Sequence, residues 1–379
     1  MAADLASYRR LFPVFEHRTY MNSCSQGALG EPVRGAMESY MDGMDEFGSL
    51  WETWAGKQEE VRELLAQALG ATPAEVAVTP SASAAVSSIA SALIASGTRR
   101  KVVTTSLEFP TIGQIWHAQA PYGVTVEHVR ADDTHHLDPE AIAAAIDDDT
   151  ALVSVTHVCY RNGAMTDVRR IIDLAHERGV PVLVDAYQSG GSYPIDFHAL
   201  GADFLVGGCL KYMLGMPGVG FGLVNAATTS ELVPTVTGWF AARDIFSMDI
   251  YAYDPAKDAR RFEGGTPTVP SLYAAAAGLR LLLEVGIEAS WARSNALHGA
   301  LRSGIAEIGG RVVTPADAHG AMLAVASTDD HALVDAMAQD RVVVSCRDGN
   351  VRISPHFYNT DDDVERVLAS LRANRHLLA

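Results

Sequence analysis

Short apolar segments alternate with helical segments between residues 76 and 225, which is the pattern of an α/β unit with a mostly parallel sheet. Helices are predicted from Ala82, Pro110, Asp138 and Asp167, between the earlier strands. Ligands of such sheets bind at the carboxyl ends of the strands, so the residues after each strand are the first candidates for a site. The seven predicted strands are 76–79, 101–106, 125–130, 151–158, 181–186, 203–208 and 220–225.

The pattern changes on both sides of this unit. Residues up to about 18 predict a short helix, and residues 31–69 contain helical patterning. Charge and proline interrupt the pattern near 251–261, and helices with short strands at 321–327, 342–347 and 351–354 then predict a small α+β domain. We therefore expect an N-terminal segment at 1–18 that packs on the small domain, a large domain at 19–255 and a small C-terminal domain at 256–379.

The composition is that of a globular, enzyme-sized protein. With 379 residues, 48% of them apolar, the chain can bury a large core. A net charge of −17 argues against nucleic acid as a partner, because binding to phosphates demands a basic surface. The N-terminus has no apolar core of signal-peptide length, and no segment reaches roughly 18 consecutive apolar residues. We expect a cytoplasmic protein without a membrane segment.

Several common cofactor motifs are missing. The four cysteines lie far apart without CxxC spacing, which favours free thiols over a disulfide framework or a zinc site. The 13 histidines are scattered and form no HExxH, so no metal is predicted. Neither GxGxxG nor GxxxxGK[ST] occurs, which weakens a dinucleotide or nucleoside triphosphate interpretation.

Lys211 is the first candidate for chemistry. The chain has four lysines beside 25 arginines, and the other three lysines lie in charged segments or beside arginines. Lys211 has Leu210, Met213 and Leu214 as apolar neighbours. Poor solvation lowers the pKa of an amine and makes it available as a nucleophile. On this segment alone, a lysine that merely extends from a loop into water is an equal alternative.

Polar residues also follow other predicted strands. Asp185 ends an apolar strand, where a carboxylate is costly unless a cation meets it, and Gln188 follows three residues later. His157 lies in an unusually polar strand end, although a lone buried histidine is usually a core residue. Because these strand ends share one edge of the predicted sheet, we expect their side chains to lie near one another.

Helix starts and a late strand add further candidates. Ser81, Ala82 and Ser83 open a helix whose N-terminus can bind a phosphate, although an ordinary serine N-cap is the commoner explanation. Phe109 is an aromatic residue at a strand-to-helix junction. Arg352 emerges from the last predicted strand, where it is either a surface arginine or a residue that binds a carboxylate.

Five sequence blocks in order resemble the class V aminotransferase family of fold-type I pyridoxal phosphate enzymes, which includes cysteine desulfurases, kynureninases and isopenicillin N epimerase. The resemblance runs from Tyr20 to the last helix. It implies the fold-type I architecture, a large domain with a mostly parallel seven-stranded sheet and a small α+β C-terminal domain. The blocks are THVCYRNG, DAYQSGG, PIDFHALGADFLVGGCLKYMLGMPGVGF, RFEGGTP and VRISPHFYNT.

The resemblance implies pyridoxal 5'-phosphate (PLP) as cofactor, with Lys211 holding its aldehyde as a Schiff base and Asp185 paired with the pyridinium nitrogen. Gln188 would contact the phenolic oxygen of the ring. A homodimer with shared active sites is also implied, because Thr266 would reach the phosphate from the partner subunit. The other implied residues are Ser81, Ala82 and Ser83 at the phosphate, Phe109 and His157 at the ring, and Arg352, Ser23 and Tyr160 at the substrate, with Arg352 on its α-carboxylate.

The chain departs from the relatives that it resembles in three places. One is Tyr160, which stands where many relatives carry an asparagine. Desulfurases commonly carry a serine and a histidine just before the lysine, and kynureninases a tyrosine, whereas this chain has Gly208, Cys209 and Leu210. The segment SCRDGNV before Arg352 is too short for the cysteine-bearing loop of desulfurases. Persulfide chemistry is therefore not expected, and Cys346 is expected to be a buried, inert thiol.

The substrate is expected to be an amino acid, or a larger molecule with an α-amino carboxylate. We favour β-cleavage of the carbon–sulfur lyase or kynureninase type, with transamination and epimerisation as alternatives. A catalytically silent scaffold is an alternative from another class, and the retention of Lys211, Asp185 and Arg352 speaks against it. A flavodoxin-like binding module is weaker still, since it needs neither the lysine nor the long C-terminal domain.

Overall fold

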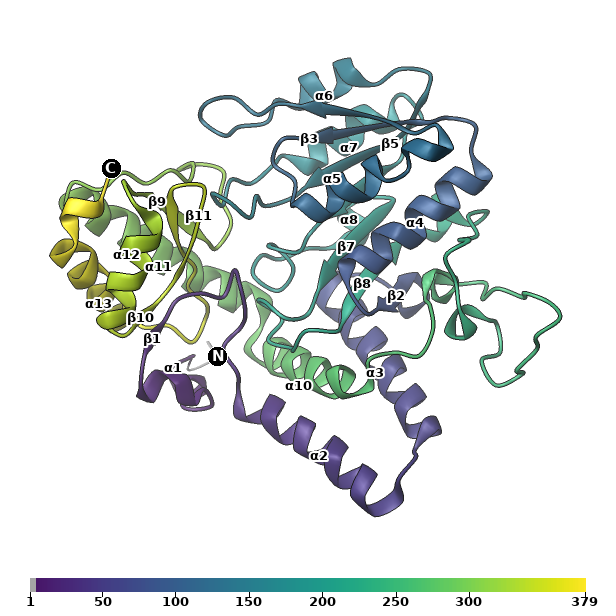
Figure 1. Ribbon diagram of the computed structural model, residues 1–379, viewed down its shortest axis with the longest axis horizontal. Helices are drawn as coiled ribbons and strands as arrows, with labels where there is room; N and C mark the ends of the chain where they lie inside the picture. The colour runs from purple at the N-terminus through teal and green to yellow at the C-terminus, as the bar shows by residue number, and fades with distance from the viewer. Residues whose placement is uncertain (1–4) are drawn as a thin grey trace.

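A computed structural model describes residues 5–379 and shows two lobes, a large one built around a wide sheet and a small one at the C-terminal end of the chain (Figure 1). The large sheet has seven strands in the order β2-β8-β7-β6-β5-β3-β4, and β8 alone runs antiparallel to its neighbours. The mostly parallel seven-stranded sheet predicted from the sequence is thus confirmed. Its strands are β2 (Val76–Thr79), β3 (Lys101–Thr105), β4 (Thr125–Val129), β5 (Thr150–Thr156), β6 (Val182–Asp185), β7 (Phe204–Gly208) and β8 (Gly220–Val224).

Helices cover both faces of this sheet, because its inner strands are apolar at successive positions. Val102 and Leu183 point into the core under α4 and α5, whereas Val103 and Val184 point into the core under α3, α6, α7 and α10. The helices of this lobe are α2 (Glu31–Phe47), α3 (Trp51–Leu69), α4 (Ala82–Ser96), α5 (Pro110–His117), α6 (Pro139–Ala145), α7 (Val168–His176), α8 (Phe197–Leu200), α9 (Ala226–Thr229) and α10 (Val269–Val285).

The small lobe is an α+β unit with its own core. A three-stranded antiparallel sheet in the order β11-β12-β9 packs against helices, and their apolar residues form one buried cluster. Near it, β1 pairs in parallel with β10. The elements are β9 (Leu323–Ala326), β10 (Val342–Val343), β11 (Ser345–Arg347), β12 (Asn350–Ile353), α11 (Ile287–Glu307), α12 (Asp330–Gln339) and α13 (Asp361–Ala373), joined by β1 (Thr19–Tyr20) and α1 (Leu5–Arg9).

The N-terminal segment lies against the small lobe. Arg9 forms an ion pair with the buried Asp363 at 2.6 Å, and Phe12 packs on Phe357 and Tyr358. Hydrophobic and charged contacts thus both join residues 9–12 to this lobe. Residues 1–4 lie outside the described part of the chain, and the segment expected at 1–18 stays a prediction.

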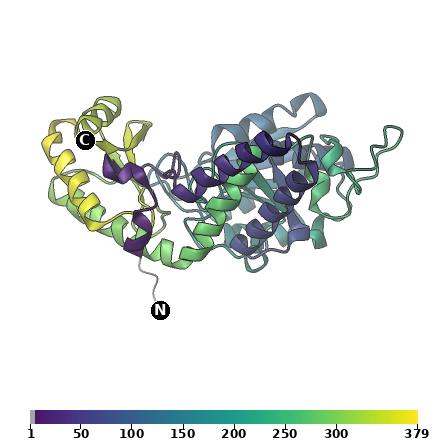
Figure 2. The ribbon, with the colours of Figure 1, turned by 90° about the horizontal axis from the view of Figure 1, so that it is seen from below.

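The helix α10 connects the lobes, as Figure 2 shows from below. It packs on α2 and α3, and Leu272 and Leu279 belong to the core of the large sheet. The next helix, α11, contributes Leu297 and Leu301 to the core of the small lobe. The limits predicted for the domains stay a prediction, and the two cores favour a boundary between α10 and α11. Within residues 5–379, no helix combines the length and apolar character that a membrane span requires.

Candidate active site

A cavity of about 290 Å³ lies at the carboxyl ends of the parallel strands, where the sequence predicted a site. The residues that line it follow β2, β3, β5, β6 and β7 or belong to the loop after β1. Eight of the predicted site residues meet there although they are up to 130 positions apart in the chain. The lining residues are Ser25, Ser81, Ala82, Ser83, Phe109, Thr111, Ile112, Thr156, Val158, Tyr160, Asp185, Tyr187, Gln188, Leu210 and Lys211.

Lys211 enters the cavity from the turn after β7. The carbonyl of Leu210 accepts a hydrogen bond from the Gly27 N–H at 2.9 Å, and a Cβ at Gly27 would collide with the carbonyl oxygen of Lys211. Burial lowers the pKa of Lys211 to about 8, with the charge of Arg352 adding to the shift while Cys24 and Asp185 oppose it. A substantial fraction of this amine is therefore neutral and nucleophilic near neutral pH.

Tyr187 is a cavity residue that the sequence did not single out. The ammonium nitrogen of Lys211 lies 4.4 Å from the centre of its ring, a cation–π distance. A Cβ at Gly208 would lie 2.4 Å from the Tyr187 hydroxyl. Gly208, which departs from the residue expected in desulfurases and kynureninases, therefore leaves the space that this ring occupies.

Asp185 ends β6 as a buried carboxyl group. Its Oδ1 accepts a hydrogen bond from the Tyr187 N–H at 2.8 Å. Burial raises its pKa, and this hydrogen bond and the charge of Lys211 oppose the shift. The predicted cation partner for this carboxylate is thus present nearby as Lys211, although the two side chains form no ion pair within 4.0 Å.

Glu108 is a second buried carboxyl group, and sequence analysis assigned it no role. Its Oε1 accepts hydrogen bonds from the Thr105 hydroxyl at 2.7 Å and from the Thr156 N–H at 2.8 Å. Its Oε2 is buried and has no hydrogen-bond partner within residues 5–379. Burial raises the pKa of Glu108 to about 8, and the charge of Asp185 adds to this rise. Near neutral pH this carboxyl group is mostly protonated.

The start of α4 forms another wall of the cavity. Ser81 is the N-cap, with its Oγ accepting a hydrogen bond from the Ala84 N–H at 3.2 Å. The ordinary capping role is therefore present. The free N–H groups of this first helical turn and the helix dipole still favour an anion at the cavity, because Ala82 and Ser83 also line it. β8 approaches so closely at Gly220 that a Cβ there would meet the Ser81 backbone.

Gln188 and Arg352 each have one buried polar atom without a hydrogen-bond partner among residues 5–379. The Gln188 amide donates to the Cys24 carbonyl at 3.0 Å, while its buried Oε1 has no partner in the part of the chain described. Arg352 is buried, and its Nη1 and Nη2 donate to the Tyr160 carbonyl at 2.8 Å and to the Ser345 hydroxyl at 3.0 Å. Its Nε is likewise without a partner there. A buried polar atom without a hydrogen bond costs free energy. Such atoms therefore indicate places where a bound ligand would supply the missing partner.

Phe109 and Tyr160 form an aromatic pair beside the cavity. Their ring centres lie 4.8 Å apart at an angle of 77°, and 43% of Phe109 is exposed. His157 lies next to this region but is buried and does not line the cavity. Its Nδ1 lies 3.0 Å from the Ser189 hydroxyl, and burial lowers its pKa to about 4, so the imidazole is neutral.

The comparisons with known proteins agree with this geometry. The sequence profile of the family described as aminotransferase class V matches residues 37–367. The chain is 36% identical to an uncharacterised aminotransferase, YcbU, of Bacillus subtilis over 97% of both chains. It is 31% identical to a kynureninase of Pseudomonas fluorescens, over 78% of this chain and 72% of the relative. The chain belongs to the class V aminotransferase family.

This class V enzyme also has the family's fold. The structure of a cysteine desulfurase from Thermococcus onnurineus covers 97% of both chains with a TM-score of 0.87 at 23% identity. The fold-type I prediction is confirmed, and the large sheet with a small α+β lobe is the architecture expected of it. At this identity the structural likeness shows the fold and leaves the reaction open.

Pyridoxal 5'-phosphate is the cofactor of the class V fold, and the cavity fits it. An amine of lowered pKa, a buried carboxylate, a helix N-terminus and an unpaired amide oxygen line one space. These are the groups that an aldehyde, a ring nitrogen and a phosphate require. The individual roles of Lys211, Asp185, Gln188 and residues 81–83 stay predictions that this donor set supports.

Four of the predicted site residues do not line the cavity, namely His157 and Arg352, described above, and Ser23 and Thr266. Ser23 is fully buried, its hydroxyl lies 2.8 Å from that of Tyr358, and Ser25 lines the cavity instead. Thr266 is exposed in the segment before α10, where the Trp239 indole donates to its hydroxyl at 3.4 Å. The substrate contact of Ser23 and the contact of Thr266 with a partner's phosphate stay predictions.

The cysteines are free thiols, as the sequence predicted. Cys24, Cys159 and Cys209 are buried, and burial raises the pKa of Cys209 to about 12. Cys346 was expected to be buried and is instead partly exposed, with a pKa raised by burial and by the neighbouring Asp330. Burial raises the pKa of Cys159 as well, so Cys159, Cys209 and Cys346 lack the lowered pKa of an activated thiol.

Proposed function

We propose that this class V enzyme cleaves a bond at the β-carbon of a substrate with an α-amino carboxylate, without a cysteine that carries sulfur away. The observation that carries the proposal is the aromatic pair of Phe109 and Tyr160 on the wall of the cavity that also holds Lys211. An apolar, partly exposed wall beside the reacting amine suits a leaving group on the substrate side chain. The 31% identity to a kynureninase supports a β-cleavage of this kind.

Arg352 is the proposed carboxylate-binding residue. Its guanidinium is fixed by Tyr160 and Ser345 and keeps its Nε free, so it is already oriented before a substrate arrives. A guanidinium binds a carboxylate through two parallel hydrogen bonds, which restricts how the amino acid lies. Because Arg352 donates to the backbone of Tyr160, a substrate held there would also lie near the aromatic pair.

Lys211 is the proposed proton carrier. PLP supplies a ring that withdraws electrons and stabilises negative charge at the α-carbon. With its pKa lowered to about 8, the amine of Lys211 can accept the α-proton and later return it. Asp185 is a buried carboxyl group, and its ionised form would favour a protonated ring nitrogen.

A panel of amino acids tests the reaction. Purified holoenzyme is incubated with each, and pyruvate, alanine, sulfide, keto acid and optical rotation are measured. β-Cleavage predicts pyruvate or alanine together with a released side chain, and it predicts loss of activity in Lys211→Ala but not in the exposed-lysine control Lys257→Ala. Keto acid formed only with an acceptor keto acid would instead support transamination, and loss of rotation without products would support epimerisation.

Transamination is the second candidate, since the relative that is 36% identical over 97% of the chain is named an aminotransferase. It uses the same proposed residues, because Arg352 and Lys211 would bind the carboxylate and move the proton in the same way. The two reactions differ in whether the β-substituent leaves. Tests with one compound that carries a good β-leaving group, with and without an acceptor keto acid, therefore separate them directly.

We also propose that the active unit is a homodimer with shared sites. A segment with exposed apolar residues protrudes from the large lobe between α9 and α10, as Figures 1 and 2 show. Ile250 and Tyr251 on it are 83% and 94% exposed, and Phe246 and Met248 are exposed as well. Such residues are unusual on a monomer's surface and are typical of an interface.

Complementation tests this arrangement. Lys211→Ala subunits mixed with Thr266→Trp subunits should recover activity, because a hybrid dimer would combine both lesions in one site and leave the other intact. The matched control mixes Lys211→Ala with Asp185→Ala, whose lesions cannot complement across subunits. Absence of recovery, with subunit exchange confirmed, would place Thr266 outside the partner's site.

A further inference from the structure

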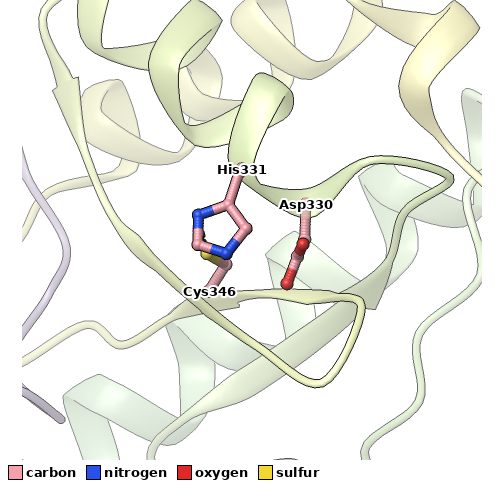
Figure 3. A group of neighbouring side chains, drawn as sticks. All are labelled: Asp330, His331 and Cys346. Atoms are coloured by element: carbon pink, nitrogen blue, oxygen red, sulfur yellow. Dashed lines mark hydrogen bonds between the residues drawn. The ribbon is translucent and has the colours of Figure 1, made fainter.

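Three metal-binding side chains converge on the small lobe, away from the cofactor cavity. Asp330 and His331 begin α12, and Cys346 lies in the middle of β11 (Figure 3). The Sγ of Cys346 lies 3.7 Å from the Nδ1 of His331, and the ligating atoms of the three residues all lie within 4.8 Å of one another. Sequence analysis predicted no metal because it found no metal-binding motif among the histidines and cysteines. Fourteen residues separate His331 from Cys346, so their approach leaves no local motif.

The separations suit one tetrahedral ion. Zinc binds a thiolate at about 2.3 Å and an imidazole at about 2.0–2.1 Å, which places sulfur and nitrogen roughly 3.5 Å apart at a tetrahedral angle. The observed 3.7 Å between Cys346 and His331 is close to that value. The ligating oxygen of Asp330 lies within 4.8 Å of both of these atoms. The fourth position would belong to water, since His331 is exposed.

Backbone contacts already orient the carboxylate. The Oδ2 of Asp330 accepts a hydrogen bond from the Gly349 N–H at 3.1 Å. Asp348 and Gly349 have φ values of 52° and 74°, so the β11–β12 turn is tight and aims this N–H at α12. A hydrogen-bonded carboxylate oxygen is a typical outer contact of a metal ligand, because it fixes the ligand before the ion binds.

The charges around the cluster permit a divalent cation. The N-terminus of α12 is partly positive, but Asp329 caps it by accepting from the Ala332 N–H at 2.9 Å, and Asp330 adds a second negative charge. Arg347 and Arg352 are the cations that act on Cys346. Arg347 is exposed, and Arg352 is held by Tyr160 and Ser345 on the other face of the hairpin. A thiolate and a carboxylate together neutralise the charge of a zinc ion.

We propose that Asp330, His331 and Cys346 form a zinc-binding site that joins α12 to the β11–β12 hairpin. Thiolate and imidazole ligands select zinc over the hard cations magnesium and calcium, which prefer oxygen. On binding, the Cys346 thiol releases its proton to the solvent and its sulfur bonds to the metal, with no change of oxidation state.

This position links the ion to the active site through a single strand. Ser345, next to Cys346 in β11, pairs with Arg352 of β12 and accepts a hydrogen bond from it. Successive residues of a strand point to opposite faces, so Cys346 points toward α12 while Ser345 points toward Arg352. An ion at Cys346 would therefore hold the strand that supports the proposed carboxylate-binding residue.

Metal titration tests the site. Reduced holoenzyme freed of metal by a chelator is titrated with zinc against a competing indicator, and with cobalt, whose thiolate charge-transfer band reports sulfur coordination. We expect one equivalent per chain, the cobalt band, and a higher unfolding temperature with zinc. Cys346→Ser should abolish the band, and His331→Ala should weaken zinc binding by at least about tenfold. Magnesium should not compete.

Two variants with substitutions outside the proposed site serve as controls for zinc binding. His376→Ala and Asp335→Asn remove an exposed histidine and an exposed α12 carboxylate elsewhere on this lobe, and both should bind zinc like the unchanged protein. Circular dichroism without metal verifies that each variant folds. Zinc bound equally well by Cys346→Ser and His331→Ala, or not bound stoichiometrically at all, would overturn the proposal. These readouts do not depend on which reaction the enzyme catalyses.

Discussion

Replacing Glu108 with glutamine should change how the stability of the protein depends on pH. The folded protein holds the Glu108 carboxyl with a pKa of about 8, against the ordinary value of 4.5, because the group is buried beside Asp185. Between these two values the folded chain keeps a proton that the unfolded chain has lost. Stability from this group is therefore fully present below about pH 4.5 and falls as the pH rises toward 8.

The size of the effect follows from the two pKa values. Each pH unit across which only the folded state holds the proton costs about 1.4 kcal/mol, so the loss between pH 4.5 and 8 reaches up to about 5 kcal/mol. Glutamine does not titrate, and its carbonyl oxygen can still accept from Thr105 and Thr156. Glu108→Gln should therefore remove most of this pH dependence. The free energy of unfolding of the variant minus that of the unchanged protein should be larger at pH 8.5 than at pH 5.5.

The assay is denaturant unfolding of the cofactor-free protein across this pH range, so that Asp185 has no ring nitrogen as a partner. Glu365→Gln, an exposed glutamate on α13, is the matched control and should retain the slope of the unchanged protein. If Glu108→Gln and the unchanged protein gave parallel curves, Glu108 would be ionised in the folded state, and the reasoning from its burial would be wrong.

Four further predictions concern the cofactor site. Sodium borohydride should fix a pyridoxyl group on Lys211, and mass spectrometry that locates it on another lysine would disprove the assignment. Asp185→Ala should retain some cofactor absorbance but lose at least about 100-fold in turnover, because an unprotonated ring stabilises negative charge poorly; unchanged turnover would remove Asp185 from its role. Gly208→Ser should lower stability by roughly 1–3 kcal/mol, since its Cβ would displace the Tyr187 ring, whereas Gly265→Ser, at an exposed position with open space and no positive φ, should leave stability nearly unchanged. Cys346→Ser should leave turnover with any sulfur-containing substrate within about twofold at saturation; complete loss of alanine formation from cysteine would show that Cys346 is a nucleophile.

Much of the fold was predictable because the large sheet is buried on both faces. Strands such as β6 and β7 are apolar at nearly every position and are bounded by polar or glycine residues, which marks them clearly in the sequence. The boundary between the lobes was harder to predict. α10 is an Ala/Leu-rich helix whose pattern fits either core, and only its contacts with α2 and α3 assign it to the large lobe.

The site was predictable where the residue type was unusual for its place. An isolated lysine and a carboxylate at the end of an apolar strand both conflict with ordinary burial rules, and both line the cavity. Glu108 and Tyr187 were missed because each lies beside residues that already explained its segment, Phe109 in one case and Asp185 and Gln188 in the other. Their importance comes from neighbours far along the chain. Likewise, the approach of Cys346 to His331 depends on how β11 packs on α12, which no local spacing encodes.

The hydrogen bond from Arg352 to the Tyr160 carbonyl joins the two lobes, because Arg352 belongs to the small lobe and Tyr160 follows β5 of the large one. The proposed binding of the substrate carboxylate by Arg352 therefore depends on both lobes together. The proposed binding arrangement of Arg352 exists only while the two lobes are in contact. The affinity of the protein for a carboxylate therefore reports on that contact. A substitution that loosens the contact between the lobes should raise the substrate concentration needed for half-maximal rate. The cofactor should stay bound, because its proposed contacts within this chain belong to the large lobe.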